Sequence, residues 1–244
     1  MTGPGQLALP FPYEPDYAGT PFIPAPSNEA ARVWLGRKEH WPGGRLALWG
    51  EAGCGKTHLL HRWASEAGAT LIQGRSLGGI TDLPSGGGLA IDDADQAEER
   101  PLLHLFNAAG EAGLSVLLVA RTPPARWPVR LPDLASRLKS VQAVGIRPAE
   151  DDLLRALLAG LLADRQLAVL ESIQDWLLLR LPRTPAVIRE AAARLDGAAL
   201  AAGAGVTRSL AGQVLADLTR DACLPNGSDP SRTEAVLLRA PRLS

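Results

Sequence analysis

Short apolar runs alternate with segments of helical periodicity through the first three fifths of the chain. The apolar runs are bounded by glycine, proline or polar residues, as buried strands are. These runs are 45–49, 69–73, 89–91 and 114–120. Helical spacing appears at 57–67 and at 100–112, the latter with Leu102, Leu103, Leu105 and Phe106 directed inward. Strands that alternate with helices form parallel sheets, so the pattern predicts an α/β fold with its ligand site at the carboxyl ends of the strands.

The pattern changes after Ile146-Arg147-Pro148, where the sheet portion ends. Four helical segments without any strand follow, at 149–165, 171–181, 184–200 and 207–220. They predict a small all-helical second domain. We therefore divide the chain into an N-terminal arm (1–20), an α/β domain (21–147), a helical domain (148–220) and a flexible C-terminal tail that lacks periodicity (221–244).

Seven prolines fall within residues 1–26, which predicts an extended arm rather than a helix or a central strand. The arm contains an apolar cluster, QLALPF at 6–11, for which two interpretations are open. Leu7, Leu9 and Phe11 can anchor in a groove on a partner, or they can pack back on their own domain.

Ser27-Asn28 precedes a segment with helical spacing and predicts a capped helix start at Glu29. On this spacing we expect the buried face of the helix to carry Ala30, Val33 and Trp34.

The composition restricts the cellular location that we expect for the protein and the kind of partner that it binds. No apolar run approaches the ~20 residues of a membrane span, and the first residues do not resemble a signal peptide, so we expect a cytoplasmic protein. Cys54 and Cys223 are the only cysteines, which does not suggest a disulfide framework. The net charge is −1, so we expect direct DNA binding to be weak or absent.

The chemistry concentrates in a glycine-rich segment between the first strand and a helix. Gly50-Glu51-Ala52-Gly53-Cys54-Gly55-Lys56-Thr57 fits G-x-x-x-x-G-K-[ST], the P-loop. Glycines allow backbone N–H groups to approach phosphate oxygens at the positive end of a helix. Lys56 supplies charge for the β and γ phosphates, and the Thr57 hydroxyl can hold Mg²⁺. The alternative is a glycine-rich turn before a lysine, which the strand–loop–helix context disfavours.

Two carboxylates end the strand that begins at Leu89. In a P-loop protein Asp92 would hold Mg²⁺ through water, and Asp93 could orient the attacking water. The alternative is a strand that ends in a solvated acidic turn.

Several segments resemble the DnaA group of the AAA+ ATPases, whose P-loop domain is a parallel-sheet α/β domain followed by a small helical lid. GKTHLL at 55–60, Ser27-Asn28 and Asp92-Asp93 are similar to the corresponding segments of that group. LPDLASRL (131–138) and QLALPF (6–11) are similar to segments of the regulatory DnaA homologues that inactivate DnaA and bind the DNA polymerase III sliding clamp (β subunit). The resemblance covers about 6–220.

The resemblance implies roles by position. Arg183 would reach from the lid to the nucleotide phosphates, and Arg137 would be an arginine finger for a neighbouring subunit's nucleotide. The bland alternative for Arg137 is a salt bridge with Asp133, one helical turn away. ADP or ATP would be bound by Gly50, Ala52, Gly53, Cys54, Gly55, Lys56, Thr57 and His58, Mg²⁺ by Thr57 and Asp92, with Asp93 catalytic, and the clamp by Gln6, Leu7, Leu9 and Phe11.

One departure concerns Val119-Ala120, where relatives tend to carry a polar pair. We therefore expect weak intrinsic hydrolysis or resident ADP, unless Arg121 or Thr122 substitutes. Only residues 221–244 follow Arg220, so no DNA-binding domain of about a hundred residues is expected there. The leading hypothesis is a negative regulator of replication initiation that stimulates hydrolysis of DnaA-bound ATP. A helicase-loader type ATPase, a clamp adaptor without effect on hydrolysis, and homo-oligomerisation remain open.

Overall fold

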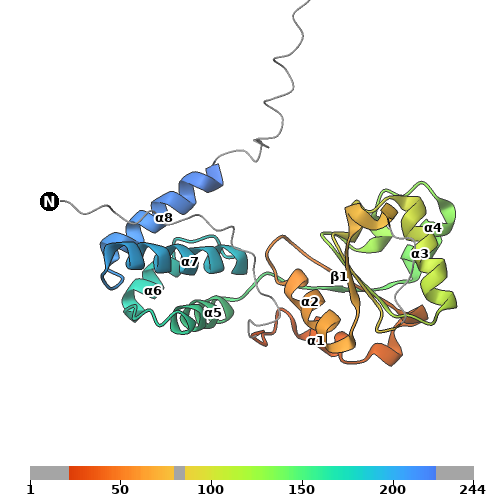
Figure 1. Ribbon diagram of the computed structural model, residues 1–244, viewed down its shortest axis with the longest axis horizontal. Coiled ribbons are helices and arrows are strands. Elements are labelled where there is room, and N and C mark those ends of the chain that lie inside the picture. Colours follow the sequence, from red (N-terminus) through yellow and green to blue (C-terminus); the bar gives the residue numbers. More distant parts are fainter. Residues whose placement is uncertain (1–21, 80–85, 224–244) are drawn as a thin grey trace, which may run out of the picture.

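The computed structural model describes residues 22–79 and 86–223, which form a sheet-containing part and a helical part (Figure 1). The sheet has five parallel strands in the order β2-β3-β4-β1-β5. The strands are β1 (Arg45–Trp49), β2 (Thr70–Gln73), β3 (Leu89–Asp92), β4 (Val116–Ala120) and β5 (Gln142–Gly145). Because β1 lies between β4 and β5, the loop that follows it emerges near the middle of the sheet.

Four helices belong to the sheet-containing part: α1 (Glu29–Leu35), α2 (Lys56–Ala67), α3 (Glu99–Glu111) and α4 (Pro132–Ser140). Alternate side chains of β1 enter opposite cores. Leu46 and Leu48 pack with residues of α1 and α2, while Ala47 packs with residues of α3 and α4. This period of two buries both faces of the sheet, so the strands are apolar on both sides.

The helical part consists of α5 (Asp151–Asp164), α6 (Glu171–Leu178), α7 (Pro185–Ala202) and α8 (Arg208–Cys223). Its core is separate and leucine-rich, with Leu158, Leu177 and Leu195 fully buried or nearly so. Figure 1 shows these helices at one end of the molecule, with α3 and α4 at the other. Phe22 packs against the core under α1 and α2 and Ile23 against the helical core, so the entering chain touches both parts.

The predicted α/β class and the helical second part are confirmed. β5 and α4 carried no prediction, because QAVG is too short for a recognisable pattern and gains its identity from pairing with β1. α8 continues to Cys223, past the residue at which we expected the tail to begin. Within the described residues, the structure contains no helix with the length and apolar character needed to cross a membrane.

The expectation for the buried face of α1 was wrong for Ala30 and Val33, whereas Trp34 is partly buried and packs against the core under α1 and α2. Ala31 is fully buried, whereas Ala30 is exposed and Val33 is 44% exposed. The reason lies in the segment before the helix: the Asn28 side chain accepts from the Ala25 N–H and donates to the Ile23 carbonyl instead of capping α1. These bonds set the rotation of a helix of only two turns.

Candidate functional site: the P-loop and the lid helix above it

The glycine loop between β1 and α2 has a backbone that side chains would obstruct. Gly53 and Gly55 have φ of +78° and +100°, the left-handed region in which glycine is favoured. A Cβ on Gly50 would lie 2.7 Å from the carbonyl oxygen of Ile146, which follows β5. The loop therefore needs glycine at these positions, and it ends at the N-terminus of α2, the positive end of that helix.

Lys56 lies inside the loop with only 8% of its surface exposed. Its ammonium donates to the carbonyl oxygens of Gly50 at 2.9 Å and Glu51 at 2.7 Å, and it lies 3.6 Å from the Cys54 sulfur. Ala52, in contrast, is exposed at the loop tip. The loop thus encloses one positive charge whose partners are neutral carbonyls, an arrangement suited to an anion.

Asp92 and Thr57 lie together beside this loop. Asp92 is 7% exposed; burial raises the pKa of its carboxyl, while hydrogen bonds from the Thr57 hydroxyl and the Asp93 N–H oppose that shift. The Asp93 N–H donates to Asp92 Oδ1 at 3.0 Å. A hydroxyl and a carboxylate in contact next to a phosphate loop are the two protein groups from which P-loop proteins build a Mg²⁺ site.

Asp93 adopts a left-handed conformation, with φ 46° and ψ 45°, which Asp tolerates better than most residues. Its carbonyl lies against Gly74, where a Cβ would overlap it. The end of β3 is therefore held by the segment after β2. Such strained positions occur often at functional sites.

The lid helix α7 begins directly above the loop. A Cβ on Gly53 would touch Thr184 and Ala186, each 3.3 Å away. Thr184 caps α7 by accepting from the Val187 N–H. Farther along the helix, Arg189 lies 3.3 Å from Nδ1 of His58, which is 3% exposed on α2 and contacts the Phe22 ring edge-on.

The Arg183 side chain pairs within the helical part rather than with the P-loop. Its guanidinium donates to Asp151 at 3.0 Å, at the start of α5, and it lines a cavity of about 250 Å³ with Leu154 and Leu178. The lid guanidinium that the structure brings to the P-loop helix is that of Arg189. The sequence carried a signal for it: Arg189 lies one turn after Pro185, which is buried at the start of α7.

Val119 and Ala120 end β4 with 1% exposure each, one in the core under α1 and α2 and the other in the core under α3 and α4. Arg121, the next residue, places its backbone N–H 3.4 Å from Asp95. The side chains of Arg121 and Thr122 are exposed. The end of this strand therefore presents apolar groups where a polar group would position water.

Arg137, on α4, is partly exposed and forms no ion pair with Asp133 in the part of the chain that the structure describes. Its charge, after the larger effect of burial, lowers the pKa of Arg45. Arg45 begins β1, whereas the P-loop follows the end of that strand. Arg137 lies in the last turn of α4, just before β5, whose first residue Gln142 pairs with Leu46 near the start of β1, so it lies toward the edge of the sheet away from the P-loop. Gln6, Leu7, Leu9 and Phe11 lie outside the described residues.

No protein-family model matches the chain. Among solved structures, domain III of the Thermotoga maritima replication initiation protein DnaA is similar over 85% of this chain and 99% of that one, with a TM-score of 0.71 and 20% identity. DnaA from Aquifex aeolicus bound to AMPPCP is similar over 68% of this chain, with a TM-score of 0.56 and 19% identity. The chain has the fold of DnaA domain III.

This fold is not exclusive to initiators. The Thermotoga maritima RuvB Holliday junction branch migration motor is similar over 79% of this chain and 69% of that one, with a TM-score of 0.60 and 17% identity. The present chain spans 61% of the Aquifex aeolicus DnaA chain. At these identities the likeness concerns the fold, and function depends on the residues of the site.

Proposed function

We propose that this protein is a negative regulator of replication initiation of the Hda type. It would hold an adenine nucleotide, bind the sliding clamp through Gln6, Leu7, Leu9 and Phe11, and stimulate hydrolysis of the ATP bound to DnaA. Clamp binding would raise its local concentration beside DnaA.

The nucleotide site supports the first part of the proposal. The Gly50–Thr57 loop would hold the phosphates of ADP or ATP, with Lys56 exchanging its carbonyl partners for phosphate oxygens. Mg²⁺, if bound, would neutralise phosphate charge between Thr57 and Asp92. Phosphate oxygens and water would complete its coordination, as in other nucleotide-bound Mg²⁺ sites.

The position of Arg137 is the observation that carries the proposal. Arg137 lies in the last turn of α4, just before β5, which pairs with β1 near the start of that strand, whereas the P-loop follows the end of β1; this supports a role toward another molecule's nucleotide. The apolar end of β4 is consistent with this proposal. Without a polar group there, the protein would hydrolyse its own ATP slowly and would act mainly on the ATP bound to DnaA.

An assay of DnaA-bound ATP on DNA tests the proposal and its alternatives. We expect the protein to accelerate hydrolysis only when clamp is loaded on the DNA. Rapid hydrolysis of ATP by the protein alone would favour the helicase-loader type ATPase. Clamp binding with unchanged DnaA hydrolysis would favour the adaptor.

A further inference from the structure

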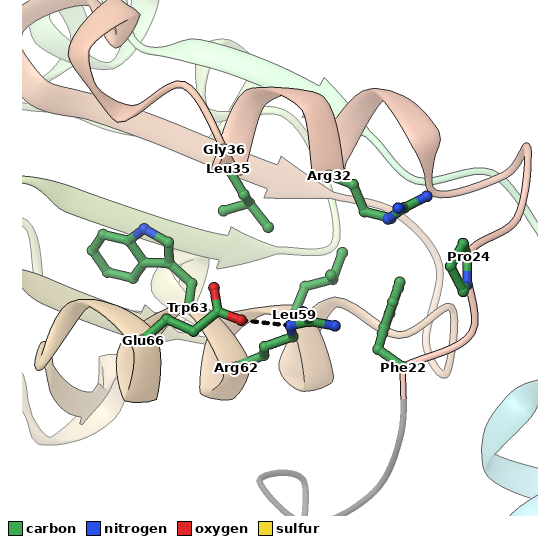
Figure 2. A pocket seen from close by; sticks show the side chains of 9 residues that line it. All are labelled: Phe22, Pro24, Arg32, Leu35, Gly36, Leu59, Arg62, Trp63 and Glu66. Carbon is green, nitrogen blue, oxygen red and sulfur yellow. Dashed lines mark hydrogen bonds and ion pairs between the residues drawn. The ribbon is translucent and has the colours of Figure 1, made fainter.

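A groove runs between α1 and α2 on the side of the molecule where the described chain begins (Figure 2). Its volume is about 360 Å³, and its apolar surface comes from Phe22, Leu35, Leu59 and Trp63. Figure 2 shows Arg32 on α1 and Arg62 on α2, on opposite sides of the groove. The groove therefore combines an apolar floor with cations on both rims.

The charges of the groove do not cancel. Arg62 is paired with Glu66 at 2.7 Å, and this exposed pair is worth little. Arg32 is exposed and forms no ion pair with any residue of 22–79 or 86–223. A fitting occupant would thus bring aromatic side chains and at least one carboxylate.

Residues immediately before the groove have this composition. The first 21 residues contain two carboxylates, Glu14 and Asp16, and no Lys or Arg, and the carboxylates alternate with Tyr13, Pro15 and Tyr17. We infer that Tyr13–Tyr17 docks in the groove between α1 and α2, with Glu14 and Asp16 facing Arg32 and Arg62.

Chain length favours this segment over the rest of the arm. Phe22 lines the groove, so Tyr17 is five residues from it, a reach of roughly 15 Å in extended Pro-rich chain. The groove follows α2 from Leu59 to Glu66, roughly 10 Å at 1.5 Å per residue. Docking there would leave residues 6–11 projecting from a fixed point, and it does not depend on what those residues bind.

Chymotrypsin cleavage of the full chain tests the inference, because the Tyr13–Glu14 and Tyr17–Ala18 bonds lie in the docked segment. Each rate is divided by the rate for a free peptide of the same residues 10–24, which removes changes in intrinsic protease preference. We expect the parent to be cleaved about fivefold or more slowly than Arg32→Glu, since cleavage tracks the undocked population. Arg32→Gln should fall between them.

Arg37→Glu is the matched control, because Arg37 is exposed beside α1 but does not line the groove. It should be cleaved like the parent, and Asp16→Arg should restore protection to Arg32→Glu. Parent cleavage as fast as that of Arg32→Glu, or an equal effect of Arg37→Glu, would overturn the inference. Protection that increases with protein concentration would assign the groove to a second copy instead.

Discussion

At the scale of residues, the glycine loop depends on its backbone conformation, whereas the direction of the lid arginines depends on contacts with other helices. Gly53, Gly55 and Lys56 were identifiable because the loop conformation requires those residue types at that spacing. Arg183 and Arg189 are both arginines near the start of α7, and the resemblance assigned the contact with the phosphates to Arg183. The Arg183 guanidinium donates a hydrogen bond to Asp151 on α5, whereas the Arg189 guanidinium contacts the His58 ring on α2.

Replacement of Lys56 tests the nucleotide site. Lys56→Ala removes the only ammonium enclosed by the loop, so ADP and ATP affinity should fall by at least about tenfold, the equivalent of roughly 1.4 kcal/mol. Lys38→Ala, an exposed lysine outside the site, is the control for loss of one positive charge. Calorimetric titration measures both; unchanged ADP affinity in Lys56→Ala would remove the assignment.

Burial of Asp92 predicts a pH dependence of stability. Its folded pKa is raised above the ordinary 3.8, chiefly by desolvation, so the folded state retains a proton that the unfolded state has lost. The free energy of unfolding contributed by this group therefore decreases as pH rises above 3.8 through the folded pKa. Asp92→Asn, without nucleotide or divalent ions, should have a higher Tm than the parent at pH 7, and the difference should shrink toward pH 4. A pH-independent difference in thermal unfolding would contradict this origin.

Arg189 and Arg183 form a matched pair on the lid. Arg189→Ala should weaken nucleotide binding more than Arg183→Ala, since Arg189 contacts His58 on the P-loop helix whereas Arg183 pairs with Asp151. Binding of a fluorescent ATP analogue measures both variants. If Arg183→Ala has the larger effect, the lid must reorient when nucleotide binds, and Arg183 regains the role that its sequence position suggested.

At the scale of elements, segments marked by an apolar run or by helical spacing were predicted well, and segments without such a mark were not. The strand expected at 45–49 is β1 to the residue, and the helix expected at 57–67 differs from α2 by one residue. β5 lies at the edge of the sheet and three of its four residues are only partly buried, so no run of apolar residues marks it. The rotation of α1 depends on hydrogen bonds to the segment before it, which periodicity does not contain.

Residues 6–11 of the arm are the segment that we propose binds the sliding clamp. Leu9→Ala combined with Phe11→Ala should weaken clamp binding by several kcal/mol, given about 1.5–3 kcal/mol for each fully buried large apolar side chain. Val33→Ala with Leu71→Ala removes two exposed apolar side chains from the body of the protein and should leave binding unchanged. A pull-down in which the arm variant retains the clamp as well as the parent does would sink the clamp assignment.

At the scale of the whole molecule, the parallel sheet separates two kinds of chemistry. Every strand ends at the same edge, which gathers the P-loop, Asp92 and the start of α7 around one site. Arg137 lies in the last turn of α4, just before β5, which pairs with β1 near that strand's beginning, toward the opposite edge. This separation depends on α4 and β5, which the sequence pattern did not mark, so it became visible only in the structure, as did the absence of an ion pair between Arg137 and Asp133 among the described residues.

Replacement of Arg137 tests whether that separation serves a partner. A guanidinium facing another molecule's γ-phosphate stabilises charge that develops in the transition state, and such a finger is worth roughly 10³–10⁵ in rate. Arg137→Ala should therefore abolish stimulation of DnaA-bound ATP hydrolysis while leaving Tm, ADP affinity and clamp binding near those of the parent. Lys139→Ala, an exposed cation on the same helix, is the control and should stimulate normally. Arg137→Lys should rescue poorly, because an ammonium lacks the planar fork of the guanidinium. Full stimulation by Arg137→Ala on clamp-loaded DNA would leave this arginine without a catalytic role and would favour the clamp adaptor.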